Sequence, residues 1–215
     1  MEPGTRTQQQ TMNRLRGRPR GFKIEKALDA ALELFWKQGY SNTTTRELET
    51  NLGLSQSSIY NTFGCKRDLL AAALDRYEAI TDRELLGPLE QSDKGLASIE
   101  TFFDALQHWV THQGRRGCML INMMAEDGGE TDAIAKRARS YRTRVRNALR
   151  DALVRAVKDG ETADNALEDR ADLLLGLVLG LNIAARARAS DAELRTLFDA
   201  VRTQIRSWAL VEPVS

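Results

Sequence analysis

Residues 44–66 read TTRELETNLGLSQSSIYNTFGCK, and this stretch contains the signals of two short helices joined by a tight turn. Thr44 and Glu47 have the spacing of a capping box, in which a hydroxyl and a carboxylate bond the free amides at a helix start. Gly53 provides the permissive backbone on which that helix ends, and Ser55 can cap a second helix. We therefore predict a helix-turn-helix in this stretch.

The second of these helices has two different faces. Ile59 and Phe63 are four residues apart and should point into the core. The other face is short, uncharged and rich in hydrogen-bonding groups: Gln56, Ser57, Tyr60 and Asn61. Side chains of this kind suit the reading of base edges in the major groove of DNA.

The composition favours an all-α fold. The chain has 215 residues, with 28% charged side chains, few aromatic residues and only four prolines. This length allows a small domain attached to a larger one. The net charge of +1 hides an asymmetry, because residues 1–70 carry eleven basic and seven acidic side chains and the remainder carries twenty and twenty-three. The basic excess accompanies the helix-turn-helix, as a phosphate-binding end requires.

The sequence favours a cytoplasmic protein. Its two cysteines, Cys65 and Cys118, form neither a C-x-x-C motif nor a disulfide framework, which indicates a reducing compartment. Residues 1–20 lack the apolar run of a signal peptide. The longest apolar stretch, residues 173–183, is too short to cross a bilayer and contains Asn182, so no membrane segment is expected.

Residues 1–20 are polar and are predicted to form a disordered basic arm. Within them, residues 16–20 read RGRPR and resemble the core of an AT-hook. The narrow minor groove of A·T-rich DNA concentrates negative potential and admits guanidinium groups, which would place Arg16, Arg18 and Arg20 in that groove. A solvated basic tail is the alternative, and the adjoining helix-turn-helix favours the DNA interpretation.

Helical periodicity extends on both sides of the helix-turn-helix. A helix over residues 22–38 should complete a three-helix unit, and another should run from Lys66 to about residue 81. The start of the latter can meet a phosphate with both the Lys66 charge and the helix dipole. This helix is long enough to enter the rest of the protein, and Gly87-Pro88 is expected to break it.

Five motifs in order carry a family resemblance: LFWKQGY at 34–40, TTTREL at 43–48, GLS at 53–55, IYNTF at 59–63 and KRDLL at 66–70. Over residues 17–75 the chain closely resembles the N-terminal domain of TetR/AcrR-family transcriptional regulators. The resemblance implies base contacts from Gln56, Ser57, Ser58 and Asn61. It implies DNA-backbone contacts from Thr44, Tyr60 and Lys66, with Thr45 beside them. Cys65 departs from the family, which usually has Ser there, and is interpreted as a small, at least half-buried thiol.

The rest of the chain, residues 67–215, is predicted to be a helical effector-binding and dimerisation domain. A helix over residues 96–113 carries aromatic side chains beside its aliphatic stripe, and residues 117–126 form a short apolar helix rich in methionine. A long helix over residues 132–158 bears a row of arginines. We predict an effector pocket lined by Phe102, Leu106, Trp109, Cys118, Met119, Asn122, Met123, Tyr141 and Arg142. Plain core packing, or a solvated face for Arg142, is the alternative for any one of these residues.

Two alternatives replace the pocket by another kind of sensor. The Gly117-Cys118 segment resembles that of a TetR-family subgroup responding to electrophiles and small carboxylates, which would make Cys118 a reactive thiol rather than a core residue. His108 and His112 have a spacing that can bind a metal, although no Glu follows the first His and both lie away from the inward stripe, which favours two solvated histidines. A small helical enzyme using Cys118 is a remote further alternative, because no ordered nucleophile, base and orienting residue is found.

The last two helices should form a dimer interface. Residues 167–188 are apolar nearly all round, and Ser190 and Glu193 form a capping box for a final helix. The family resemblance also places the interface there. We assign to it Leu174, Leu177, Gly180, Leu181, Ala184, Leu197, Val201, Ile205 and Trp208.

These predictions combine into one function. We expect residues 21–66 to be the DNA-binding domain of a homodimeric repressor that binds double-stranded operator DNA. A small-molecule effector in the C-terminal domain would release it by moving the Lys66 helix. No cofactor, no metal and no enzymatic activity are expected.

Overall fold

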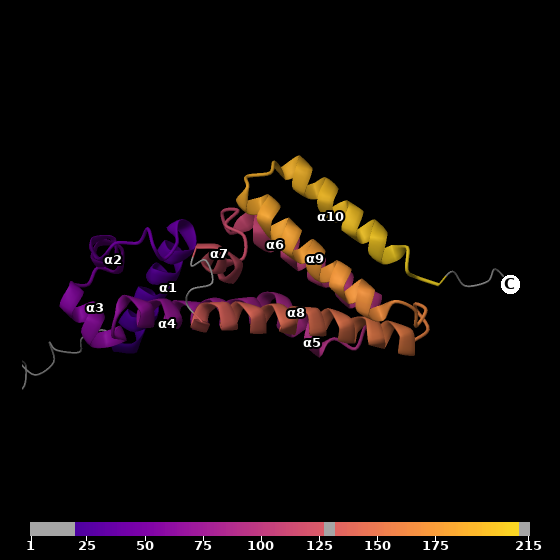
Figure 1. Ribbon diagram of the computed structural model, residues 1–215, viewed down its shortest axis with the longest axis horizontal. Helices are drawn as coiled ribbons and strands as arrows, with labels where there is room; N and C mark the ends of the chain where they lie inside the picture. Colours follow the sequence, from indigo (N-terminus) through magenta and orange to yellow (C-terminus); the bar gives the residue numbers. More distant parts are fainter. Residues whose placement is uncertain (1–19, 127–131, 211–215) are drawn as a thin grey trace, which may run out of the picture.

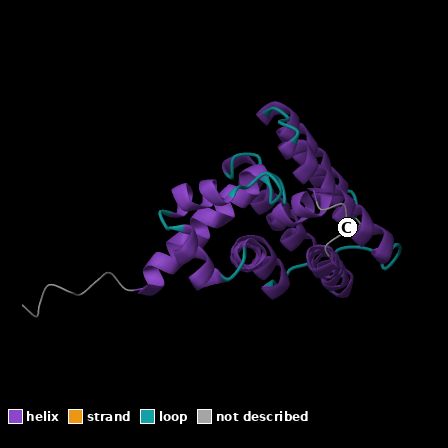
Figure 2. Ribbon diagram, turned by 60° about the vertical axis from the view of Figure 1, so that its left-hand side comes forward, coloured by secondary structure: helices purple, strands orange, loops and turns teal. Residues whose placement is uncertain are grey.

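The computed structural model describes residues 20–126 and 132–210, and within these ranges the chain is helical, with connecting turns and one isolated β-bridge between Thr162 and Ala209 (Figures 1 and 2). The all-α prediction is confirmed. The helices are α1 (Arg20–Gln38), α2 (Thr45–Leu52), α3 (Gln56–Phe63), α4 (Lys66–Thr81), the π-helix η1 (Asp82–Leu86), α5 (Gly87–Gln91), α6 (Leu96–His112), α7 (Met119–Glu126), α8 (Asp132–Lys158), α9 (Leu167–Arg186) and α10 (Asp191–Arg206).

Helices α1, α2 and α3 gather at one end of the elongated molecule, with α4 leading away from them (Figure 1). The predicted caps are confirmed: the Thr44 hydroxyl accepts from the Glu47 amide, the Glu47 carboxylate accepts from the Thr44 amide, and Gly53 ends α2 with φ +63°. The Ser55 hydroxyl caps α3 by accepting from the Ser58 amide. The helix-turn-helix is therefore fixed by its own local hydrogen bonds.

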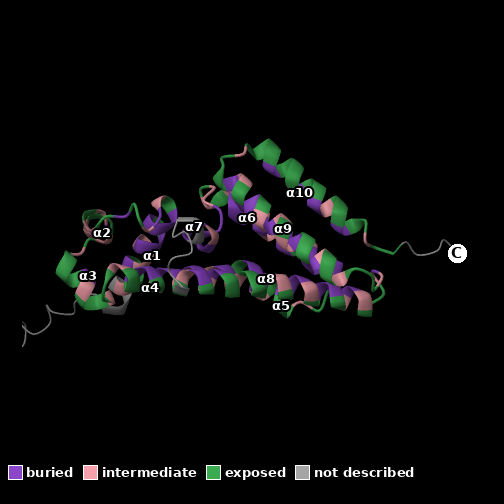
Figure 3. Ribbon diagram, viewed as in Figure 1, coloured by how far each residue is buried: buried purple, intermediate pink, exposed green. Residues whose placement is uncertain are grey.

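The core of this end comes from α1 and the helices packed on it. Phe35 of α1, Leu48 of α2 and Leu69 of α4 are fully buried, and Ile59 of α3 is nearly so. The buried face of α3 leaves its opposite face in solvent, as the spacing predicts (Figure 3).

The predicted break at Gly87-Pro88 is wrong, because helical structure continues through α4, η1 and α5 to Gln91. The chain widens there into a π turn, in which the Gly87 amide donates to the Asp82 carbonyl five residues back. Pro88 then lies in the first turn of α5, where its fixed φ is tolerated. Arg144 of α8 holds the segment from outside by pairing with Asp82 and Glu90.

The larger part of the molecule packs α6, α8, α9 and α10 around one apolar core, with α10 on the outside (Figure 1). Figure 3 shows α10 green on its outer side and buried toward α6. The predicted Ser190–Glu193 capping box of α10 is confirmed. Within the described residues, no helix is both long and apolar enough to span a bilayer.

Candidate DNA-reading surface and effector pocket

The exposed face of α3 carries the side chains predicted to read bases. Gln56, Ser57, Ser58 and Asn61 are all exposed. The two Ser hydroxyls bond to the Ser55 cap, at 3.1 Å and 2.9 Å, and are partly committed to it. Among the described residues, no hydrogen bond engages the side-chain amides of Gln56 or Asn61. These two amides are therefore the groups most available for base edges.

The side chains predicted to contact phosphate lie around the start of α2 and α4. Thr44 is exposed, and the Thr45 hydroxyl lies 3.2 Å from the Tyr60 hydroxyl, which joins α2 to α3. The Lys66 ammonium donates to the Tyr40 carbonyl at 2.7 Å and lies 4.3 Å from the centre of the Tyr40 ring. Partial burial lowers the pKa of Lys66, and the Glu47 carboxylate acts in the opposite direction. An ammonium has three donors, so two remain for a phosphate oxygen.

The basic arm is only partly within the structure. Arg16 and Arg18 lie outside the described residues, and Arg20 is the first residue of α1. Minor-groove contact by these arginines therefore remains a prediction.

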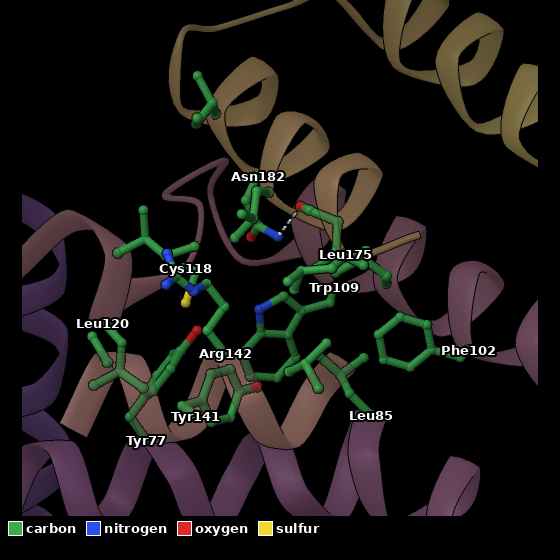
Figure 4. A pocket seen from close by; sticks show the side chains of 17 residues that line it. Tyr77, Leu85, Phe102, Trp109, Cys118, Leu120, Tyr141, Arg142, Leu175 and Asn182 are labelled. Carbon is green, nitrogen blue, oxygen red and sulfur yellow. Dashed lines mark hydrogen bonds between the residues drawn. The ribbon is translucent and has the colours of Figure 1, made fainter. Parts of the chain in front are cut away.

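A cavity of about 170 Å³ lies between α4, α6, α8 and α9, with the start of α7 at one side (Figure 4). Most of its wall is apolar, and its few polar side-chain groups are two tyrosine hydroxyls, an indole N–H, a thiol, an amide and one guanidinium. The lining side chains are Tyr77, Leu85, Phe102, Leu106, Trp109, Cys118, Leu120, Ile121, Ala138, Tyr141, Arg142, Val145, Leu175, Val178, Leu179, Asn182 and Ile183.

Six of the nine predicted pocket residues line this cavity: Phe102, Leu106, Trp109, Cys118, Tyr141 and Arg142. The other three do not. Met119 and Met123 are packed into the core, and the Asn122 amide donates to the Arg116 carbonyl at 2.7 Å, which fixes the preceding loop. The face of α7 toward the cavity carries Leu120 and Ile121 instead, so the helix is turned relative to the predicted orientation.

Two polar residues of the wall were not assigned to the pocket from the sequence. Tyr77 comes from α4 and Asn182 from α9, far apart in the chain. Asn182 had a detectable signal, because it is a single amide inside the apolar stretch of residues 173–183. Tyr77 had none beyond its place on the inward stripe of α4.

The surroundings of Cys118 do not favour a reactive thiol. Cys118 is buried beside the Tyr77 hydroxyl, and its burial raises the pKa of the thiol. A thiol that reacts with electrophiles or oxidants needs exposure and a lowered pKa. Cys65, predicted to be at least half-buried, is instead exposed.

The histidine pair lies outside the cavity. His108 and His112 are exposed on α6, their ring centres are 3.9 Å apart, and the Nδ1 atom of His112 lies 2.9 Å from the His108 carbonyl. Across the described part of the chain, no group of three or more metal-binding side chains is present. The structure does not bring the histidines together with the buried Cys118, as the enzyme alternative would need.

A contact between α1 and the loop before α7 joins the cavity to the DNA-reading end. The Trp36 indole donates to the Gly117 carbonyl at 2.9 Å and packs on Tyr77 and Trp109, with ring centres 5.2 Å and 5.8 Å away. Gly117 has φ +68°, and a Cβ there would lie 2.8 Å from the Asn182 carbonyl oxygen. The residue beside Cys118 is thus held between α1 and α9, and the cavity wall touches α1 directly.

The outer surfaces of α9 and α10 expose large aliphatic side chains among polar ones. Leu173, Ile183 and Leu197 are 45%, 59% and 43% exposed. A groove between the two helices is lined by Leu173, Gly176, Leu177, Gly180, Leu181, Leu197, Ala200, Val201 and Gln204.

Part of the predicted interface set needs correction. Leu174 and Ile205 are fully buried in their own chain, so they have no surface for a partner. Leu181 and Val201 are also largely buried and reach only the floor of the groove. Leu177, Gly180, Ala184 and Leu197 remain at least partly accessible. Trp208 is half-buried under the Arg170 guanidinium, 5.1 Å from its ring centre.

Two protein-family models match the chain in the order that the fold suggests. Residues 27–73 match the model for bacterial regulatory proteins of the tetR family, and residues 95–201 match the tetracyclin repressor-like C-terminal domain. The chain therefore belongs to the TetR family of DNA-binding transcriptional regulators.

Curated relatives and solved structures agree with this assignment. The HTH-type transcriptional repressor ComR of Escherichia coli strain K12 is 28% identical over 205 residues, covering 93% of this chain and 95% of ComR. The repressor BdcR of the same strain is 31% identical over 111 residues, covering 51% and 56% of the two chains. A cysteine mutant of the regulator CifR, complexed with a 26-bp double-strand operator DNA, has a TM-score of 0.76 at 24% identity, covering 89% of this chain and all of CifR.

Proposed function

We propose that this protein is a homodimeric transcriptional repressor that leaves its operator when a small molecule occupies the cavity. The observation that carries the proposal is the Trp36 contact, because it links a largely apolar cavity to the helices that present Gln56 and Asn61. The names of ComR and BdcR, both repressors, support the direction of regulation. Residues 21–66 would then form the DNA-binding domain and residues 67–215 the effector-binding and dimerisation domain.

The proposed release follows from the packing of the cavity wall. Tyr77 belongs to α4 and Trp109 to α6, and both pack on Trp36 of α1. A ligand that displaces either ring changes the position of α1 and α4 relative to the larger part of the molecule. Release requires the ligand to bind one arrangement more tightly than the other.

The buried Cys118 thiol supports a pocket rather than a thiol sensor. An electrophile-responsive role, which the Gly117-Cys118 resemblance suggested, would need the thiolate that burial disfavours. We therefore assign Cys118 to the cavity wall.

The repressor role is tested by operator selection. Purified protein is incubated with its own upstream DNA and with a pool of random duplexes, and bound DNA is separated by gel shift. We expect a palindrome whose half-sites lie about one helical turn, ~34 Å, or slightly more apart. Failure to retain the upstream DNA or any palindrome would contradict the proposal.

The dimer is tested by placing a charge on the exposed surface of α10. In the Leu197→Glu variant the symmetric interface would bury two carboxylates in an apolar groove, which is strongly unfavourable. We expect sedimentation equilibrium at micromolar concentration to give a dimer for wild type and a monomer for this variant. Thr196→Glu, at the exposed neighbouring position outside the groove, should remain dimeric. A monomeric wild type, or a dimeric Leu197→Glu variant, would refute this interface.

A further inference from the structure

Arg142 of α8 is exposed and, like Arg139, has no acidic partner within the described ranges, whereas four other arginines of this helix do. Arg137 pairs with Asp75 and Glu78, and Arg144 with Asp82 and Glu90. Arg146 pairs with Glu168 and Asp172, and Arg150 with Glu168. Arg142 is also the single cationic side chain among the described residues that line the cavity. A guanidinium left without a carboxylate at an apolar cavity is placed to receive one from a ligand.

The cavity determines the size of the rest of such a ligand. Its volume of about 170 Å³ is close to that of an engineered protein cavity of about 150 Å³ that binds benzene. Aromatic and aliphatic side chains from α6, α8 and α9 surround this space, including Trp109, Val145 and Val178. The body of the ligand should therefore be apolar and about the size of one aromatic ring.

Asn182 adds a hydrogen-bonding group to the otherwise apolar α9 side of the cavity. Its side chain is 5% exposed and lines the cavity, and its amide nitrogen donates to the Val178 carbonyl at 2.8 Å (Figure 4). No donor in the described part of the chain reaches its amide oxygen. An amide oxygen has two acceptor sites, so this oxygen can accept a hydrogen bond from a donor group on a bound molecule.

We propose that the effector is a small apolar carboxylate whose carboxylate group pairs with Arg142 and whose ring-sized body fills the cavity. This inference rests on the proposed function and specifies the ligand class of the same cavity. A hydroxyl on the ligand would satisfy the Asn182 oxygen. A bidentate, charge-assisted pair of hydrogen bonds between the guanidinium and the carboxylate would orient the ligand.

Phenylacetate and its neutral amide, phenylacetamide, test this class because they have nearly the same shape. Each is titrated at pH 7.5 into the full-length protein, and binding is followed by calorimetry and by tryptophan fluorescence, to which Trp109 in the cavity wall contributes. We expect phenylacetate to bind at least tenfold more tightly than the amide. The Arg142→Gln variant should lose that preference. Arg139→Gln is the matched control, since Arg139 is exposed on the same helix, lies outside the cavity and has no ion pair within the described ranges.

Equal affinity for acid and amide, absence of binding by both probes, or an unchanged preference in Arg142→Gln would overturn the ligand class. The 3- and 4-hydroxy derivatives of phenylacetate extend the test to Asn182. Severalfold tighter binding by at least one isomer supports a hydrogen bond to Asn182, and no tighter binding by either isomer rules that bond out. Operator binding and dimer mass are measured on the same proteins without ligand. A failure of the carboxylate inference is thereby distinguished from a failure of the repressor proposal.

Discussion

Replacing Gln56 or Asn61 by alanine should each weaken operator binding by about 2–6 kcal/mol per dimer, because a lost base contact costs about 1–3 kcal/mol at each of two half-sites. Both side chains are exposed on α3. Their removal should therefore leave the melting temperature unchanged. Affinity is measured by gel shift or fluorescence anisotropy on the selected operator at fixed salt, since protein–DNA affinity depends steeply on ionic strength.

Salt dependence separates base reading from phosphate contact in the same experiment. The Gln56 and Asn61 variants should keep the wild-type slope of log affinity against log salt, since neither side chain carries charge. Asn147→Ala, which removes an exposed amide from α8, is the matched control and should bind as wild type does. A wild-type affinity in both α3 variants would show that this face does not read the operator.

The second large effect is expected from Trp36→Ala. Trp36 is 3% exposed, stacks on Trp109 and bonds the Gly117 carbonyl. Removing a buried tryptophan costs about 3–5 kcal/mol, which for a chain of this length corresponds to roughly 6–20 °C in melting temperature. Thermal unfolding is followed by circular dichroism at one fixed protein concentration, because a dimer's stability depends on concentration.

Two variants refine the interpretation of that result. Trp36→Phe keeps a ring but leaves the Gly117 carbonyl unpaired, so a smaller loss of about 1–3 kcal/mol is expected. Trp208→Ala removes a tryptophan that is only half-buried and should cost less than Trp36→Ala. If Trp36→Ala melts within a degree or two of wild type, the contact between α1 and the cavity loop carries little energy.

The helix-turn-helix could be predicted residue by residue because its signals are local. Thr44, Glu47, Gly53 and Ser55 act within one turn of their own position, and the structure places each in the predicted role. The continuation of the helix through Gly87-Pro88 could not be predicted from local signals. Whether a proline stops a helix depends on how the preceding turn widens and on what clamps it, and here Arg144 comes from a distant helix.

Helical periodicity predicted part of the cavity wall. Phe102, Leu106 and Trp109 share one face of α6, so all three line the cavity wall if that face does. The orientation of α7 was not predictable from periodicity, because that short helix carries apolar side chains on several faces and its methionines suit core and pocket equally well.

The residues of the dimer surface were also hard to predict, because apolar side chains lie on most faces of α9. Helix α9 is apolar nearly all round, so Leu174 and Leu177 are equivalent in the sequence. Only the packing of α6 and α8 against it decides that Leu174 is buried and that Leu177 lies in the groove. An apolar pattern predicts that a helix is covered on both sides, without telling which side is covered by its own chain.

The π turn at η1 is a position at which the continuous helical segment from Lys66 to Gln91 can lose a residue. A turn closed between Asp82 and Gly87 holds one residue more than a regular α-helical turn. Deleting one residue there would restore ordinary hydrogen bonding while the flanking turns keep their faces toward α1 and α8. A deletion elsewhere in α4 would instead rotate every later side chain by about 100°. Chains that differ by one residue in this helix can thus share the same arrangement of cavity and DNA-reading helices.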